Sequence, residues 1–184
     1  MLLQFVPAAI ATNKVTQKEV MDIHNKALTV DTHVDTPMAM VDQGLDMGKK
    51  HHPPGSRVDF VRMQEGGLDA IFFAAFTAQR ERTPENTQEA YRMAHQMIDS
   101  TYAACERYPG MARIALSSAD AAACKEQGIK AIYIGMENGF PLGTDLKRVK
   151  EFYHRGVRYI TLSHSKNNDI CDSSSDAKGP EHNG

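Results

Sequence analysis

Two almost entirely apolar runs constrain the fold of this chain more than any other feature. They are residues 68–76 (LDAIFFAAF) and residues 130–136 (KAIYIGM). Strands of this composition are typical of a parallel sheet that is covered on both faces. Segments with helical periodicity lie between the runs, and an alternation of strands and helices favours parallel βαβ units. The sequence therefore predicts an α/β fold.

Capping residues, glycines and prolines divide the rest of the chain into elements. Long polar loops are expected at residues 41–57 and 166–184. The first three expected helices are residues 18–26, a short segment capped by Asp59, and a long segment that Thr83-Pro84 opens. A fourth helix runs to Gln127 with Ser118 as its cap. The fifth covers residues 145–155, with Thr144 as its cap and with Leu146, Val149 and Phe152 facing inward. The expected strands are residues 28–34, 68–76, 112–116, 130–136 and 157–163.

Polar side chains of the kinds used in active sites stand at the C-terminal ends of three of these strands. They are His33 and Asp35, Glu137, and His164. The carboxyl ends of parallel strands form one edge, where the sites of barrels and open sheets lie. A barrel is favoured because no glycine-rich phosphate loop follows the first strand. Such barrels take about 250 residues, so the 184 residues are too few for a complete one.

Alternate residues of a strand point the same way, so His33 and Asp35 are expected on one face, together with Asp31. A divalent cation is a suitable partner for such groups at the end of a buried strand. The alternatives are a core histidine and a carboxylate that caps the turn at Thr36-Pro37. Asp31 is interpreted as a supporting residue, because a third ligand from one strand would crowd the metal.

Composition narrows the functional classes. The formal charge of −2, from 21 basic and 23 acidic side chains, argues against a nucleic-acid partner, and no apolar run is long enough for a transmembrane segment. Three cysteines without CxxC spacing indicate free thiols. Residues 1–17 are expected to be a leader, either a signal remnant or a disordered segment, ahead of a single barrel domain at 18–184. The compartment stays open between cytoplasmic and periplasmic or secreted.

Three motifs carry a resemblance to a known family. Residues 30–37 (VDTHVDTP), 134–139 (IGMENG) and 159–165 (YITLSHS) resemble the membrane (renal) dipeptidase family, metallopeptidase family M19. The resemblance implies that the chain is a truncated first half, about strands 1–4, of a TIM-like (β/α)₈ metallo-hydrolase barrel. It also implies an enzyme with two zinc ions that hydrolyses dipeptides, including those with a C-terminal D-residue, by a metal-bridging hydroxide. It also implies the roles of the residues: His33 and Asp35 bind one zinc, Glu137 bridges both and is catalytic, and His164 is catalytic and contacts the substrate near its scissile carbonyl.

The resemblance further implies that the remaining metal ligands lie beyond Gly184. The chain is therefore expected to be inactive alone unless a complementary C-terminal half or a second copy, as in a homodimer, supplies the rest. Two other hypotheses stay open. One is another binuclear amidohydrolase-type or phosphoesterase barrel, against which the Glu137 bridge argues. The other is a non-catalytic binding module derived from the barrel, which would carry no zinc.

Overall fold

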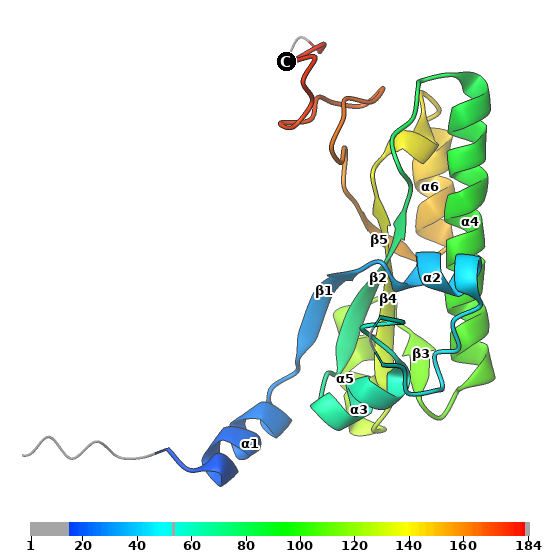
Figure 1. Ribbon diagram of the computed structural model, residues 1–184. Helices are drawn as coiled ribbons and strands as arrows, with labels where there is room; N and C mark the ends of the chain where they lie inside the picture. Colours follow the sequence, from blue (N-terminus) through cyan, green and yellow to red (C-terminus); the bar gives the residue numbers. More distant parts are fainter. Residues whose placement is uncertain (1–14, 53, 183–184) are drawn as a thin grey trace, which may run out of the picture.

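The computed structural model describes residues 15–52 and 54–182 (Figure 1). The expected leader falls largely on residues 1–14, outside the described residues, while Gln17 already belongs to the first helix. The helices are α1 (Gln17–Lys26), α2 (Thr36–Gln43), α3 (Phe60–Gly66), α4 (Pro84–Arg107), α5 (Ser118–Glu126) and α6 (Lys147–His154), with a 3₁₀ turn, η1 (Phe140–Leu142). The strands are β1 (Val30–Val34), β2 (Ala70–Phe76), β3 (Ala112–Ile114), β4 (Lys130–Glu137) and β5 (Val157–Ile160).

All five strands pair in parallel in one sheet, as the apolar runs predicted. The order is β1-β2-β4, and the two short strands β3 and β5 share the remaining edge of β4. β3 pairs with the start of β4, at residues 130–132, whereas β5 pairs with residues 134–136. The carboxyl ends of β1, β2, β4 and β5 therefore face the same side of the molecule, the upper side in Figure 1.

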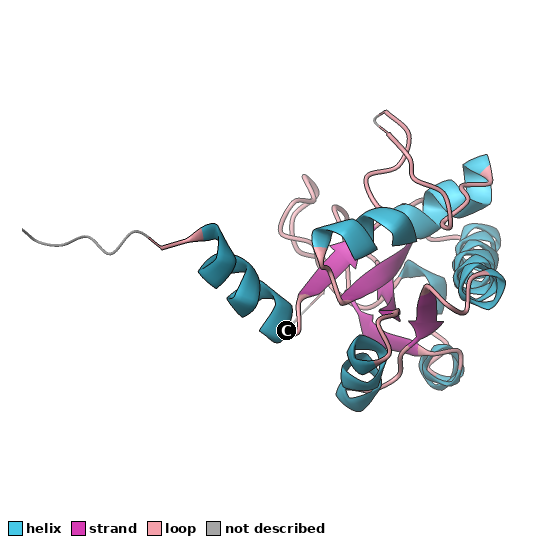
Figure 2. Cartoon of the chain, turned by 90° about the horizontal axis from the view of Figure 1, so that it is seen from below, coloured by secondary structure: helices cyan, strands magenta, loops and turns pink. Residues whose placement is uncertain are grey.

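Helices α2, α3, α4 and α6 pack on one face of the curved sheet, and the view from below shows helices around the strands (Figure 2). Helix α5 packs on the other face, against Ala70, Ala131 and Tyr133. Residues of β4 alternate accordingly: Ile132, Ile134 and Met136 pack into the helix-covered cores. Tyr133, Gly135 and Glu137 point to the opposite, concave face. Of the described helices, none is both long and apolar enough to cross a bilayer.

Several local signals specify the elements as expected. Asp59 caps α3 and Thr83 caps α4, each through its side-chain oxygen, and Pro84 stands in the first turn of α4. Gly128, at φ 70°, follows α5 in the left-handed region where glycine is favoured. One cap was predicted one residue too late: Ser117, not Ser118, caps α5, in a capping box with Asp120.

Two helices differ from the prediction. Pro37 stops the strand but also opens α2, because proline is accepted in the first helical turn, so residues 41–43 are helical and not part of a loop. α6 begins at Lys147, and Thr144 is not its cap; the Asp145 carboxylate accepts the Lys147 N–H instead. As a result only Phe152 of the predicted inner stripe is buried, while Leu146 is 82% and Val149 40% exposed.

Candidate metal centre

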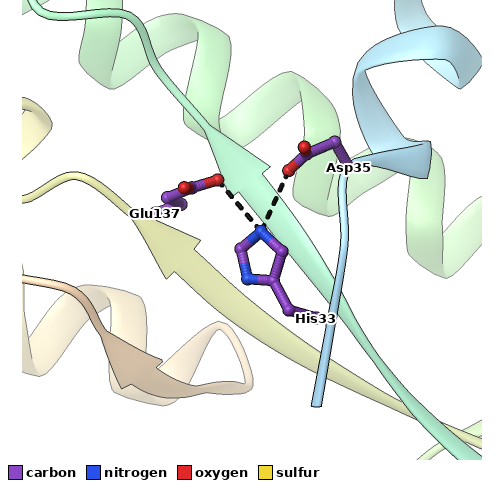
Figure 3. A group of neighbouring side chains, drawn as sticks. All are labelled: His33, Asp35 and Glu137. Carbon is purple, nitrogen blue, oxygen red and sulfur yellow. Dashed lines mark hydrogen bonds and ion pairs between the residues drawn. The ribbon is translucent and has the colours of Figure 1, made fainter. Parts of the chain in front are cut away.

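His33, Asp35 and Glu137 meet at the carboxyl edge of the sheet (Figure 3). Nε2 of His33 lies 3.1 Å from Oε2 of Glu137 and 3.2 Å from Oδ1 of Asp35. One donor atom from each of the three residues lies within 4.8 Å of the other two. The side chains that the sequence assigned to one metal site are therefore brought together, as a shared ligand set requires.

Each of the three residues comes from a different local structure. His33 is on β1, where the pairing with β2 shifts register between Asp31 and Val34. Asp35 is at the N-cap of α2, yet its side chain makes no capping hydrogen bond. The turn-capping alternative for Asp35 is therefore wrong, and its carboxylate stays directed at the cluster. Glu137 is the last residue of β4.

The electrostatics of the cluster favour a cation. Burial and the neighbouring charge of Asp35 raise the pKa of Glu137, and the nearby His33 offsets this only in part. Two carboxylates that face one imidazole nitrogen repel each other, and a divalent cation between them would relieve that repulsion. One imidazole nitrogen with two carboxylates is also a donor set that zinc accepts. The residues present thus fit a metal ion.

His164 lies at the rim of the same edge. Its Nε2 is 3.4 Å from Oε1 of Glu137, and its ring packs edge-on against Phe76, with centroids 5.0 Å apart. The His164 side chain is 46% exposed, whereas that of Glu137 is only 14% exposed. His164 is therefore close enough to touch a molecule bound over the cluster while remaining open to solvent.

Tyr159 of β5 belongs to the site but was not singled out by the sequence analysis. Its hydroxyl lies 2.9 Å from Nδ1 of His33. Burial, together with the charges of Glu137 and Asp35, raises the pKa of Tyr159 to about 12. The sequence signal for it is Gly135, because a glycine inside an apolar strand often marks a place where another group comes close to the backbone. A Cβ at Gly135 would lie 2.1 Å from the Tyr159 ring.

A buried amide pair was also missed. Asn168 lies in the polar loop expected at residues 166–184, yet it is fully buried and donates to Oδ1 of Asn138 at 3.0 Å and to the carbonyl of Leu162 at 2.6 Å. Asn138 follows Glu137 directly, has φ 74°, and donates to the carbonyl of Thr77 at 2.9 Å. The pair therefore ties the residue after Glu137 to the segment that carries His164.

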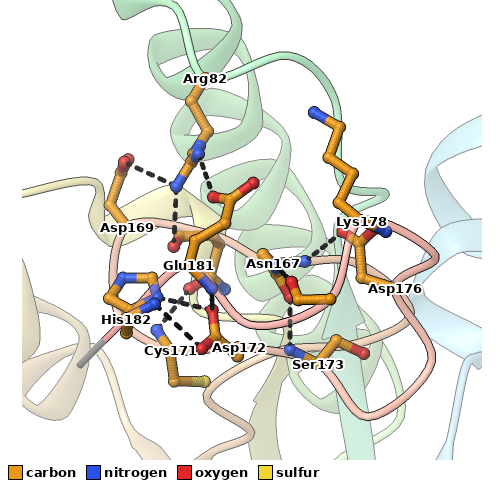
Figure 4. A network of polar contacts seen from close by, with 12 residues as sticks. Arg82, Asn167, Asp169, Cys171, Asp172, Ser173, Asp176, Lys178, Glu181 and His182 are labelled. Atoms are coloured by element: carbon orange, nitrogen blue, oxygen red, sulfur yellow. Dashed lines mark hydrogen bonds and ion pairs between the residues drawn. The ribbon is translucent and has the colours of Figure 1, made fainter. Parts of the chain in front are cut away.

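The C-terminal segment is held over the strand ends by a polar network (Figure 4). Arg82 pairs with Asp169 and Glu181. Asp172 accepts hydrogen bonds from the ring of His182 and from the backbone N–H of Glu181, which hold its pKa at about 2. Between this segment and residues 79–82 lies a hollow of about 820 Å³, so the region beside His164 is open.

The other candidate residues lie outside the cluster. Asp31 accepts the backbone N–H of His33 and so supports the strand, as expected. His51, in the polar loop expected at residues 41–57, hydrogen-bonds through Nε2 to the carbonyl of Asp46 at 2.7 Å. The three cysteines are free thiols, as predicted: Cys105 and Cys124 are buried on α4 and α5, and Cys171 lies in the C-terminal segment.

Comparison with known proteins decides the family. A sequence profile of the membrane dipeptidases, peptidase family M19, matches residues 17–184. The chain belongs to this family. Relatives include dipeptidase ataJ of Aspergillus terreus, which is 27% identical over 154 residues; the match covers 80% of this chain and 38% of that protein. The chain thus spans well under half the length of this relative.

Solved structures agree with the fold. The probable dipeptidase PvdM from Pseudomonas aeruginosa superimposes with a TM-score of 0.77 at 26% identity, over 86% of this chain and 40% of that one. A metallopeptidase from Rhodobacter sphaeroides, bound to a phosphinate mimic of the dipeptide L-Ala-D-Ala, reaches 0.63 at 17% identity, over 76% of this chain and 46% of that one. The parallel α/β sheet is therefore part of the M19 barrel fold.

Proposed function

We propose that this chain carries part of the active site of a zinc-dependent dipeptidase. The observation that supports this most is the convergence of His33, Asp35 and Glu137 at the carboxyl edge of the sheet, with donor atoms within 4.8 Å of one another. In barrels of this kind the catalytic groups lie at that edge. Membership of the dipeptidase family supports the choice of reaction.

In this proposal His33 and Asp35 hold one zinc ion, and Glu137 is shared between two. A bridging ligand must offer two oxygens to different partners, which a carboxylate can do and an imidazole cannot. Oε2 of Glu137 faces His33, whereas Oε1 faces His164. The two oxygens therefore point to different sides of the site. The remaining zinc ligands are proposed to come from sequence that corresponds to the later strands of the family's barrel.

Zinc bound here would lower the pKa of water toward about 7 and polarise the peptide carbonyl. The protein residues supply position and hydrogen bonds. Phe76 holds the ring of His164 beside the cluster, from where its imidazole can donate a hydrogen bond to the carbonyl oxygen of the substrate. A donor that stabilises the developing oxyanion contributes about 3 kcal/mol in comparable sites.

The proposed substrates are dipeptides, including those with a C-terminal D-residue. The Rhodobacter sphaeroides relative of this fold binds a mimic of L-Ala-D-Ala, which supports this choice. A peptide of two residues is also compatible with a site at the mouth of a barrel, where the space above the strand ends is limited by the surrounding loops.

The 184 residues alone are proposed to lack part of the catalytic machinery. The concave face of the sheet has a hollow of about 350 Å³ beside α5, and its mainly apolar lining includes Val30, Phe72 and Tyr133. In a closed barrel this face is covered by the remaining strands. We therefore propose that activity requires a complementary C-terminal half or a second copy of the chain.

The test combines zinc analysis with a turnover assay. We expect the purified 184-residue chain to bind zinc but to leave L-Ala-D-Ala intact. A polypeptide that supplies the later strands should restore hydrolysis of the dipeptide but not of phosphate esters. Hydrolysis of phosphate esters in place of the dipeptide would indicate another type of metallo-hydrolase, and a chain that takes up no zinc would support the binding-module hypothesis.

A further inference from the structure

The two ring nitrogens of His33 have separate partners. Nε2 faces the carboxylates of Asp35 and Glu137, at 3.2 and 3.1 Å. Nδ1, on the other side of the ring, lies 2.9 Å from the hydroxyl of Tyr159. The two rings are nearly parallel, at 24°. The direction of Nε2 is therefore coupled to the position of a hydroxyl on a different strand, β5.

We propose that Tyr159 is a positioning residue for the metal centre, whose hydroxyl holds Nδ1 of His33 so that Nε2 faces Asp35 and Glu137. The inference rests on the proposed function, because it assigns a partner to one of its metal ligands. Histidines that bind metals commonly use the second ring nitrogen in this way, and the loss of such a partner weakens metal binding about 10- to 100-fold.

A hydroxyl suits this position because it both donates and accepts hydrogen bonds. The hydroxyl can donate to Nδ1 when that nitrogen carries no proton, and it can accept from Nδ1 when the ring proton is there. A metal ion bound at Nε2 would leave the ring proton on Nδ1, which would donate to the hydroxyl oxygen of Tyr159. A carboxylate or carbonyl at this position could only accept.

The packing around Tyr159 fixes where its hydroxyl lies. The ring lies over Gly135 of β4, so closely that a Cβ there would be 2.1 Å from its ring carbon Cζ. Phe72 of β2 also packs against the ring, with centroids 5.4 Å apart. Because the ring is held by β4 and β2 together, the hydroxyl keeps a constant position relative to His33.

The chain offers a matched control in Tyr133. Its ring also packs on Phe72, with centroids 4.6 Å apart. Its hydroxyl, however, donates to the carbonyl of Ser117 at 2.7 Å and not to His33. Removing either hydroxyl takes one oxygen from a tyrosine of the same concave face, but only Tyr159→Phe removes the contact with His33.

The experiment compares the wild-type chain with Tyr159→Phe and Tyr133→Phe. Zinc affinity is measured by calorimetric titration, and the ring nitrogens of His33 are followed by ¹⁵N NMR in the metal-free protein, with His33→Gln to assign the signals. We expect Tyr159→Phe to bind zinc about 10- to 100-fold more weakly and to shift the His33 signals. Tyr133→Phe should match the wild type in both measurements.

The outcomes separate this inference from the proposed function. Wild-type zinc affinity in Tyr159→Phe, or unchanged His33 signals in that variant, overturns the role of Tyr159. A wild-type chain that binds no zinc contradicts the proposed function instead. In that case the metal-free spectra still decide whether Tyr159 sets the His33 ring: altered signals in Tyr159→Phe support it, and unaltered signals refute it.

Discussion

Nε2 of His33 and Oε2 of Glu137 are 3.1 Å apart, although a third strand, β2, lies between the strands that carry them. Strands two places apart in a sheet are separated by roughly 9.5 Å. Their side chains meet only where both lean over the concave face of a curved sheet, as in a barrel wall. The curvature of the sheet is therefore what assembles the cluster.

The first prediction concerns Glu137→Gln. The amide keeps the shape of the side chain but removes one of the two carboxylate charges that face His33. Zinc affinity should therefore fall more than about 100-fold, which exceeds the loss expected when a hydrogen-bond partner of a ligand is removed. Without metal, the variant should melt at or above the wild-type temperature, because the repulsion from Asp35 is gone. Calorimetric titration and thermal melting measure these effects.

Glu65→Gln is the control for this change, since Glu65 is exposed and pairs with Lys50 at a distance from the cluster. Its zinc affinity should equal that of the wild type. If Glu137→Gln bound zinc as tightly as Glu65→Gln, the assignment of Glu137 as a ligand would be wrong.

The second prediction concerns the approach of Tyr159 to Gly135. A Cβ at Gly135 would overlap the Tyr159 ring, so Gly135→Ala should destabilise the chain by about 1–3 kcal/mol. Gly66→Ala is the control, because nothing lies within 4 Å of its added Cβ and alanine favours the helix by about 0.5–1 kcal/mol. Urea denaturation compares the two, and equal stability of both variants would contradict this packing.

The third prediction tests the backbone at Asn138, which has φ 74°. Both Asn138→Gly and Asn138→Ala remove the hydrogen bonds to Thr77 and Asn168. Alanine adds the cost of the left-handed conformation, about 1–2 kcal/mol. Asn138→Ala should therefore be the less stable variant by that amount in urea denaturation. Equal stabilities would show that the conformation at this position relaxes at no cost.

The fourth prediction is a pH dependence at Asp69. Its Oδ2 accepts from Nζ of Lys125 at 2.7 Å and from the backbone N–H of Thr29 at 3.0 Å. Burial opposes ionisation of Asp69, but these hydrogen bonds outweigh it and lower its pKa below the ordinary 3.8. Since the folded pKa is the lower one, the stabilisation is complete above pH 3.8 and is lost as the pH falls through the folded value.

Asp69→Asn keeps an oxygen for Thr29 but removes the charge. Loss of a buried partner costs about 3–5 kcal/mol; because Lys125 is 27% exposed, solvent screening reduces the expected loss to about 1–2 kcal/mol at pH 7. The difference from the wild type should shrink as the pH falls below 3.8. Urea denaturation from pH 7 to pH 3 measures it, and a gap that stays constant over this range would exclude the ionised pair as its cause.

The correctly predicted parts of the fold are those that are determined by residues close together in the sequence. The apolar runs of β2 and β4 identify buried parallel strands, and Thr83-Pro84 starts α4 because both residues act within the first turn. The wrong predictions concern residues that are compatible with two different local structures. Pro37 ends a strand and also begins α2, and Thr144 resembles a cap although Asp145 supplies the hydrogen bond.

The candidate site was predicted in part for a similar reason. His33, Asp35 and Glu137 stand at strand ends, where chemistry is expected from topology alone. Tyr159 and Asn168 were missed because their roles depend on contacts across strands: Tyr159 reaches His33 only through the space left by Gly135, and Asn168 is buried by its bonds to Asn138 and Leu162.

The most direct test of the account is a crystal structure of the zinc-soaked chain with anomalous diffraction measured at the zinc absorption edge. We predict an anomalous peak about 2.0–2.2 Å from Nε2 of His33 and from carboxylate oxygens of Asp35 and Glu137. The absence of a peak between these three side chains, with zinc bound elsewhere or nowhere, would contradict the metal centre and the function built on it.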